Sequence, residues 1–252
     1  AELADVVLPA SAWGETDGVF TNTERRVQRV RAAVDPEGAK PDWWIIAQIA
    51  KRLKIEGFDY DSPKQIFNEL CSVSPIYAGL DWDRIDKGEY QWPVPEADHP
   101  GTPILHEKEF KNGKGIFKVI NYRNPAETIS DEFPVWLTTG RRLQSYHTRT
   151  QTGRARGIDY LLNQETLEVH PDDVEKWGLQ DGEICRMTSA RGSVDIFVSA
   201  NERSPRGTVF TTFAFSDVPV NILTGSGYDP ITETAELKVC PVRIEPIQNG
   251  GD

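Results

Sequence analysis

One stretch of the sequence combines residue types that could bind an anionic cofactor. Residues 138–156 contain five arginines and no acidic residue, although the chain as a whole has a formal net charge of −11. Threonines, a serine and the glycines Gly140 and Gly153 lie between these arginines. Arginine makes bidentate, charge-assisted contacts with phosphate oxygens, and glycine lets backbone N–H groups come close to a ligand. The stretch therefore predicts a site for a pyrophosphate-bearing cofactor on a strand-to-loop turn. The alternative is an exposed loop whose arginines pair with the chain's own carboxylates.

Other chemistries have little support in the sequence. The cysteines are Cys71, Cys185 and Cys240, and the histidines are His99, His106, His147 and His170. No cysteine pair has CxxC spacing and no HExxH pattern is present, so we expect no self-contained zinc site, iron–sulfur cluster or disulfide framework. The 138–156 stretch matches neither a GxxxxGK[ST] nor a GxGxxG motif. We expect the three cysteines to be small core residues.

Composition sets wider limits on the function. The chain has 252 residues, of which 38% are hydrophobic and 10% aromatic. No run approaches the roughly 18 apolar residues that a membrane span needs, and the mean hydropathy is −0.49. The acidic excess also argues against general nucleic-acid binding, which uses clustered Lys and Arg. We therefore expect a folded protein that neither enters a membrane nor binds nucleic acid.

The elements that would position this loop indicate an α+β fold in three parts, residues 1–72, 73–133 and 134–252. In the first part, apolar residues recur at helical spacing after Pro41-Asp42, and a second helix is predicted to begin at Ser62-Pro63. A strand carrying Arg25, Arg26, Arg29 and Arg31 is predicted to be half-buried with a charged outer face. The middle part is rich in proline and is predicted to be an irregular connector.

The last part is predicted to be mostly β. Strands are expected over 135–139, 208–215 and 237–244, a short helix over 170–177 ending at Gly178, and a hairpin formed by 183–189 and 193–200. Val194, Ile196 and Val198 would lie on one face of that hairpin. Many short strands with glycine turns imply a closed or nearly closed barrel.

The first residues indicate a piece of a longer polypeptide or one subunit of a split one. No initiator Met or basic leader is present, and residues 5–8 are predicted to be the end of a buried strand with partners upstream. Removal of an initiator Met before a small residue is the alternative.

The chain resembles, over its whole length, the C-terminal portion of a molybdopterin oxidoreductase catalytic subunit, most closely a formate dehydrogenase alpha subunit. The segments that carry the resemblance are ADVVLP at 4–9, GVFTN at 18–22, RVQ at 26–28, DWW at 42–44, QWP at 91–93, residues 137–153, DPI at 229–231 and KVCPVRIEP at 238–246. As an ordered set they are typical of the superfamily, and nitrate reductases share much of this half.

The resemblance implies a fold, cofactors and site residues. Residues 1–72 would be the end of a Rossmann-like α/β domain, and residues 134–252 a six-stranded double-psi type β-barrel that binds molybdopterin dinucleotide. Such enzymes hold molybdenum or tungsten between two molybdopterin guanine dinucleotides. The residues carried over as cofactor contacts are Thr138, Thr139, Gly140, Arg141, Leu143, Ser145, Tyr146, Phe213, Asn221, Leu237 and Lys238, together with His147 and Thr148, at which nitrate-reductase-like members also have His-Thr. Ser145 occupies a position where some formate dehydrogenases have His.

The family's metal-ligating Cys or selenocysteine, its catalytic His and its 4Fe-4S motif all lie upstream of any part that matches this sequence. The resemblance therefore implies the cofactor-binding part of a formate dehydrogenase, inactive alone, with the remaining catalytic segment and iron–sulfur or other electron-transfer subunits as partners and formate or CO2 as substrate. A nitrate-reductase-like enzyme and a non-catalytic dinucleotide-binding module are the alternatives. A cytoplasmic location is favoured, and a periplasmic one is compatible because any export signal would lie upstream.

Overall fold

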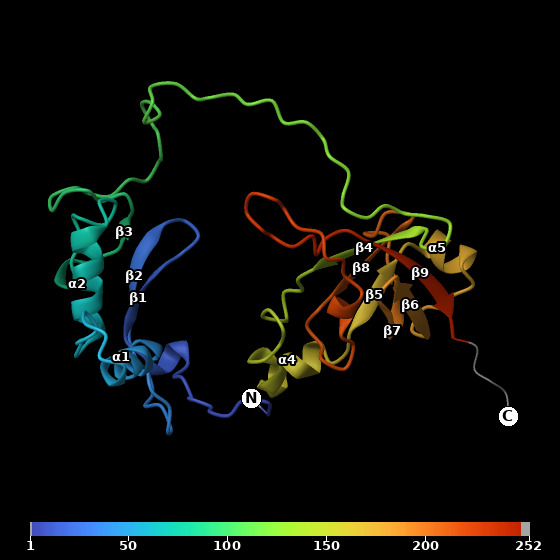
Figure 1. Cartoon of the computed structure of the whole chain (residues 1–252), viewed down its shortest axis with the longest axis horizontal. Coiled ribbons are helices and arrows are strands. Elements are labelled where there is room, and N and C mark those ends of the chain that lie inside the picture. The colour runs from blue at the N-terminus through green and yellow to red at the C-terminus, as the bar shows by residue number, and fades with distance from the viewer. Residues whose placement is uncertain (1, 248–252) are drawn as a thin grey trace. The chain divides into compact units, whose positions relative to one another are not determined.

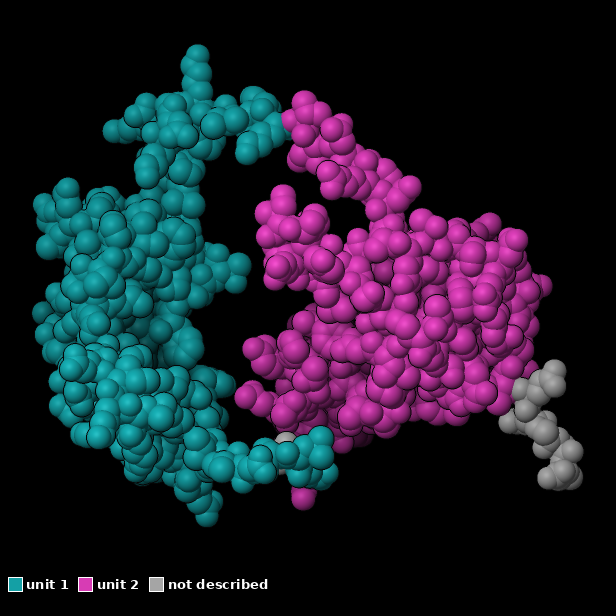
Figure 2. Space-filling view, viewed as in Figure 1, with its two compact units in different colours: residues 1–118 teal, residues 119–252 magenta. Residues whose placement is uncertain are grey.

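The computed structural model describes residues 2–247, and it divides into two compact units, residues 1–118 and 119–252 (Figure 2). In the described residues no helix is both long and apolar enough to cross a membrane. Because helices and strands both occur and a closed barrel forms, the predicted α+β barrel fold is confirmed.

The first unit is built on a small antiparallel sheet with three helices (Figure 1). The strands are β1 (Gly18–Thr21), β2 (Arg26–Val30) and β3 (Tyr90–Gln91), in the order β1-β2-β3. The helices are α1 (Asp42–Arg52), α2 (Pro63–Val73) and α3 (Trp82–Lys87), with a 3-10 turn η1 at Trp13–Glu15. Both predicted helices are thus confirmed, and α2 starts with Ser62 at the N-cap and Pro63 in its first turn.

The hydrophobic cluster of the first unit is small. Its buried members are Val27, Phe67, Cys71, Leu80, Ile85 and Val94. Strand β2 is half-buried, as the sequence predicts, but Arg29 does not lie on an exposed outer face, because its side chain is only 8% exposed. Its guanidinium carbon lies 3.4 Å from the centre of the Trp82 ring, and the carboxylates of Asp17 and Asp86 lie beside it. The Trp82 ring thus shields this charge from water, and the two acids neutralise it.

Residues 5–8 form no strand, which contradicts the prediction of a buried strand end. Val6, Val7 and Leu8 are more than half exposed. A strand needs hydrogen-bonding partners on a neighbouring segment, and none of the described residues supplies them at 5–8.

The second unit contains a closed six-stranded barrel with strand order β4-β8-β5-β7-β6-β9. The strands are β4 (Val135–Gly140), β5 (Thr166–Val169), β6 (Ile184–Ser189), β7 (Gly192–Ala200), β8 (Thr208–Thr212) and β9 (Cys240–Pro246). Helices α4 (Arg156–Leu161) and α5 (Pro171–Lys176) and the 3-10 turns η2 (Thr152–Arg154) and η3 (Val220–Ile222) connect them. The β4–β8 and β5–β7 pairs are parallel, and the other pairs are antiparallel. Closure leaves no free sheet edge.

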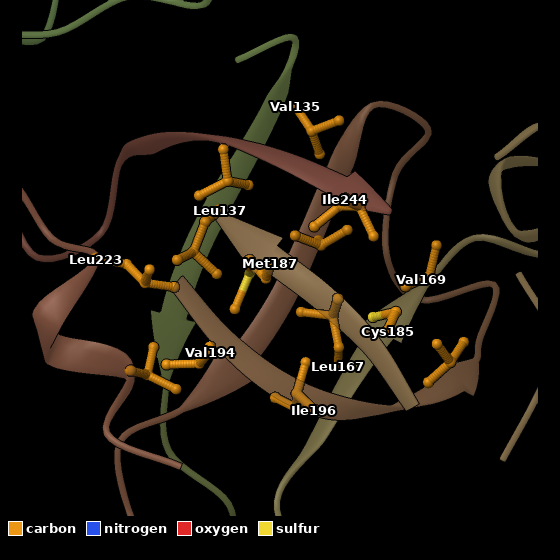
Figure 3. Packing of buried hydrophobic residues seen from close by; sticks show 14 of the residues in the cluster. Val135, Leu137, Leu167, Val169, Cys185, Met187, Val194, Ile196, Leu223 and Ile244 are labelled. Atoms are coloured by element: carbon orange, nitrogen blue, oxygen red, sulfur yellow. The ribbon is translucent and has the colours of Figure 1, made fainter. Parts of the chain in front are cut away.

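Alternating apolar residues fill this barrel, as the sequence predicts. The hairpin of β6 and β7 turns at residues 190–191, and Val194, Ile196 and Val198 all point into the core. Figure 3 shows these strands around a cluster that includes Leu137, Leu167 and Met187, whose side chains are each 0% exposed.

An ion pair attaches the segment before β4 to the barrel. Arg191, in the turn of the β6–β7 hairpin, pairs through Nη1 and Nη2 with the two carboxylate oxygens of Glu127, at 2.6 and 2.9 Å. Its Nε donates to the backbone oxygen of Leu223 at 3.0 Å. One side chain thus ties three segments of the second unit together.

Candidate functional site

One end of the barrel interior is polar. Strands β4 and β8 run parallel, so Thr139 and Gly140 lie opposite Thr211 and Thr212 at their carboxyl ends. Leu137 and Val209, two residues earlier on the same strands, are apolar and fully buried. We call the four buried residues Thr139, Glu165, Thr211 and Thr212 the polar end of the barrel; each is at most 2% exposed. The predicted cofactor loop, residues 141–156, leaves β4 at this end.

Gly140 is needed for packing at the start of the loop. A Cβ atom at this position would lie 2.4 Å from the ring of Phe210 on β8. The space that the missing side chain leaves is therefore taken by Phe210, and any larger residue would push β4 and β8 apart.

The arginines of the loop do three different things. Arg141 is exposed and its guanidinium lies 4.2 Å from the centre of the Phe213 ring. Arg142 turns inward and donates through Nη2 to the backbone oxygen and the hydroxyl of Thr166, at 3.1 and 2.7 Å. Arg149 pairs with the Asp159 carboxylate, and its guanidinium lies 4.1 Å from the Phe215 ring.

The remaining arginines, Arg154 and Arg156, are exposed. Two of the five arginines thus pair with the chain's own carboxylates, as the alternative interpretation predicts, because Arg142 also faces Glu165 and Glu168 at 4.0 and 3.5 Å. Arg141, Arg154 and Arg156 present their charge outward. The loop can therefore offer an anion several cationic groups even after its internal pairs are formed.

Phe213 contacts two residues of the predicted loop, Arg141 and His147. Besides Arg141, its ring meets the imidazole of His147 edge-on, with ring centres 5.7 Å apart. His147 and Arg149 both have left-handed backbone conformations, with φ of 50° and 60°. These values cost energy for residues other than glycine, so the tight folding of the loop is imposed by its contacts.

Lys238 and Leu237 meet β4 from the other side. The Lys238 Nζ donates to the backbone oxygen of Thr139 at 2.6 Å, and the Thr139 hydroxyl donates to the backbone oxygen of Leu237 at 2.6 Å. Thr138 lies between two cavities of about 680 and 520 Å³. Arg141 and Leu143 line the larger cavity, and Lys238 lines the smaller one.

Other predicted contacts differ in their surroundings. Ser145 is 7% exposed, and its hydroxyl has no hydrogen-bond partner among the described residues. Leu143 and Tyr146 are 98% and 70% exposed, and the Thr148 hydroxyl lies 3.1 Å from that of Thr150. An orphaned hydroxyl beside outward-facing apolar and aromatic groups fits a surface that a polar ligand completes.

Asn221 takes part in none of the contacts described above. It is exposed in η3, and within residues 2–247 its side chain makes no hydrogen bond to another predicted site residue. The structure thus joins Arg141 and His147 through Phe213, and joins Thr139, Leu237 and Lys238 by hydrogen bonds.

The described residues do not form a metal site. No group of three or more His, Cys, Asp or Glu side chains in residues 2–247 is arranged to hold a metal ion. All three cysteines are buried. Burial raises the pKa of Cys71 to about 11 and that of Cys185 to about 12, which disfavours the thiolate that a metal needs.

Sequence reasoning did not select Glu165, Thr212 or Arg142 as site residues. Arg142 lies in the loop, so its type and position were visible, but its inward direction was not. Thr212 lies within the predicted strand 208–215, whereas no element was predicted next to Glu165, which precedes β5.

Two family matches cover most of this chain. Residues 135–241 match the molydopterin dinucleotide binding domain, and residues 1–52 match the molybdopterin oxidoreductase family. The first match contains β4, the loop and the polar end of the barrel.

Curated relatives extend the similarity over nearly the whole chain. The chain is 41% identical to "F420-dependent formate dehydrogenase 2 subunit alpha" of Methanococcus maripaludis over 98% of its own length and 37% of the relative's. It is 31% identical to "Formate dehydrogenase H" of Escherichia coli over 98% of the chain and 35% of the relative. For the "Assimilatory nitrate reductase catalytic subunit" of Bacillus subtilis the identity is 36%, over 98% of the chain and 36% of the relative. The chain therefore spans little more than a third of these relatives.

A solved structure shares the fold. Acetylene hydratase from Pelobacter acetylenicus superposes with a TM-score of 0.72, at 17% sequence identity, over 95% of this chain and 38% of that one.

Proposed function

We propose that this chain, which matches molybdopterin oxidoreductase models over residues 1–52 and 135–241, forms the cofactor-binding C-terminal part of a formate dehydrogenase catalytic subunit. The supporting observation is that the loop of the dinucleotide-binding barrel presents Arg141 outward beside Phe213, in a chain that resembles formate dehydrogenase alpha subunits over 98% of its length. The reaction is the oxidation of formate to CO2, one proton and two electrons, or its reverse.

The donor groups at the barrel end fit a guanine dinucleotide of molybdopterin. Arg141 supplies a charge for a phosphate oxygen, and the orphaned hydroxyl of Ser145 supplies a hydrogen bond. Thr138 and Lys238 would bind from the other side of β4, where they line the smaller cavity. When bound, the cofactors hold molybdenum or tungsten, which accepts the two electrons.

In this proposal the chain's own residues bind and orient the cofactor and exclude water from it. Two dinucleotides, the metal ligand and a 4Fe-4S cluster would require the remainder of the catalytic subunit, consistent with the chain spanning 37% of its relative. That relative is named as a subunit alpha, so we expect further electron-transfer subunits.

The second candidate is a nitrate-reductase-like enzyme. The chain is 36% identical to the assimilatory nitrate reductase of Bacillus subtilis, more than to formate dehydrogenase H. The sequence of this chain therefore does not distinguish a formate dehydrogenase from a nitrate reductase.

The first experiment is to purify the native complex through this chain, identify the polypeptides that come with it, and measure Mo, W and Fe. Formate oxidation and nitrate reduction are then assayed with an artificial electron carrier. Formate oxidation with Mo or W and Fe supports the proposal, and nitrate reduction alone replaces it with the second candidate. Recovery of the chain alone and free of metal would favour a non-catalytic binding module.

The site assignment is tested separately on the cofactor content. Replacing Arg141 and Lys238 with Ala removes two charged contacts, and each contact contributes about tenfold in affinity. We expect much less pterin in the purified complex. The control replaces Arg186 and Lys176, cations on β6 and α5, with Ala. Unchanged pterin content in the first double variant would refute the assignment.

A further inference from the structure

Glu165 places a fully buried carboxylate at the polar end of the barrel. Its side chain is 0% exposed. The Thr212 hydroxyl donates to Oε2, and the Thr166 backbone N–H donates to Oε1 at 3.2 Å. A buried carboxylate is costly unless it is hydrogen-bonded or paired with a cation, so these partners hold it in one position.

Arg142 is the cation that faces it. Its Nη1 lies 4.0 Å from Glu165 Oε1. Its Nη2 donates to the hydroxyl of Thr166, the first residue of β5, and lies 3.5 Å from the Glu168 carboxylate. The Arg142 side chain is 14% exposed. Arg142 therefore anchors the first residues of the loop to the start of β5.

This network reaches the chain neighbours of both Arg141 and Phe213, which contact each other. Arg142 is the chain neighbour of Arg141, and Thr212 is the chain neighbour of Phe213. The Thr212 hydroxyl also accepts from the backbone N–H of Ala214 at 3.2 Å, which fixes the turn on the far side of Phe213. Glu165 thus connects Arg142, the neighbour of Arg141, to Thr212, the neighbour of Phe213. The imidazole of His147 contacts the Phe213 ring as well.

We propose that Glu165 is a positioning residue of the cofactor site: through Arg142 and Thr212 it holds Arg141 and His147 against Phe213 before an anionic ligand arrives. The role of this surface as a cofactor site rests on the proposed function. Groups already held in the binding geometry lose less entropy on association, so ordering them raises affinity without a new contact. A Glu165 that only stabilised the barrel would leave the Phe213 contacts unchanged wherever the barrel stays folded.

The first test is independent of any cofactor. The full chain has four histidines, so selective histidine labelling gives an NMR spectrum in which His147→Gln identifies the His147 signal. The Phe213→Leu variant gives the position of this signal without the ring contact. In Glu165→Gln, which keeps the side-chain size and removes the charge, we expect the signal to move toward the Phe213→Leu position. The His170 signal, from the start of α5 in the same unit, should stay in place.

A second variant decides the result if Glu165→Gln does not fold, which loss of the His170 signal would reveal. Thr212→Val keeps the shape of the side chain and removes the hydroxyl that donates to Glu165, and Thr212→Ser is its control because it keeps the hydroxyl. A His147 signal that stays at the wild-type position in the folded Glu165→Gln or Thr212→Val variant overturns the proposal.

The second test uses the complex with its cofactor. We expect Glu165→Gln to lower retained pterin by about fivefold, and we expect its effect to be clearly smaller in the Arg141→Ala background, because coupled residues do not act independently and only the part exerted through His147 remains. Losses that multiply in the double variant would show that Glu165 acts independently of Arg141 and would contradict the proposal. A complex that contains no pterin would refute the proposed function, while the NMR test would still report on Glu165.

Discussion

The two units of this chain bury apolar surface in different ways. The barrel encloses a continuous cluster of 16 buried residues, whereas the cluster of the first unit has six. In α1 the small residues Ala47 and Ala50 are buried, while Ile46, Ile49 and the C-cap residue Leu53 are 45–66% exposed. Each buried aliphatic side chain contributes about 1.5–3 kcal/mol, so the barrel has much the larger source of stability.

Sheet closure explains much of this difference. Every strand of the barrel has two neighbours, so the sequence can alternate apolar and polar residues with a fixed inside. The sheet of the first unit ends in β3, which has two residues, and it covers few apolar side chains. An apolar stripe on a helix is therefore not by itself a buried core, because burial needs a second layer of structure facing the stripe.

Separating the units should have the largest effect. We expect residues 119–252 alone to unfold in one cooperative transition, and residues 1–118 alone to unfold at a lower temperature and less cooperatively, because the buried cluster of the barrel has 16 residues and that of the first unit has six. Near-ultraviolet circular dichroism during a thermal scan measures both. A cooperative transition of residues 1–118 at the same temperature as the barrel would contradict the conclusion that the barrel is the more stable unit.

A cavity in the barrel core should come next. Leu137→Ala removes a side chain that is 0% exposed, and we expect a loss of about 2–5 kcal/mol in the free energy of unfolding. Ile46→Ala is the matched control in α1, where the side chain is 56% exposed, and its effect should stay within about 0.5 kcal/mol. Urea unfolding of the full chain compares them, and equal losses would contradict the ranking of the two units.

Alkaline pH should act on the barrel through a buried thiol. Burial raises the pKa of Cys185 from the ordinary 9.0 to about 12. The folded state therefore keeps the proton while the unfolded chain loses it, so the contribution is complete below pH 9 and declines as the pH rises to 12. One proton gives a slope of at most ~1.4 kcal/mol per pH unit.

The measurement is the unfolding midpoint of the second unit between pH 8 and pH 12. Cys185→Ala should reduce this slope and leave the part due to Cys240, whose pKa burial also raises, whereas Cys71→Ala in the first unit should leave the slope unchanged. The same slope in Cys185→Ala and in the wild type would contradict the assignment to this thiol.

The smallest effect should come from the barrel surface. Arg186 Nε and Nη2 lie 2.7 and 2.9 Å from the Asp195 carboxylate, but both side chains are about half exposed. The hydrogen bond from Arg186 lowers the pKa of Asp195, so the pair helps above the ordinary carboxyl pKa and this help is lost in acid. Water and salt screen such a pair. We expect Arg186→Ala to leave the thermal midpoint at neutral pH within error, and a clear drop would mean that the surface of the barrel matters as much as its core.

Local patterns predicted several regular elements but not α3, α4, β3 or β5. Alternation located the β6–β7 hairpin and its buried face, and the Ser62-Pro63 pair located the start of α2. Residues 5–8 had the composition of a strand but form none, because a strand depends on neighbours that composition does not show.

The direction of charged side chains could not be predicted in the same way. Arg29 is shielded by Trp82, which is 53 positions away, and Arg142 is paired at β5, more than 20 positions along the chain. Glu165 is held by Thr212 across 47 positions. Such contacts exist only after the chain has folded, so the sequence could select the loop as a unit but not divide its arginines between ligand and scaffold. The division of residues 1–72 from 73–133 and the cofactor contacts as a set stay predictions.

The link between Glu127 and Arg191 has a consequence for how the chain can be cut. The segment just before it is accessible to proteases, because Phe117, Val119, Ile120 and Tyr122 are 85–102% exposed. A cut there leaves Glu127 on the barrel fragment, where it still pairs with Arg191. A cut between Glu127 and β4 would remove the carboxylate and leave the half-buried guanidinium beside Cys240 and Leu223 without its anion. Limited digestion should therefore stop at a barrel fragment whose first residue lies before Glu127.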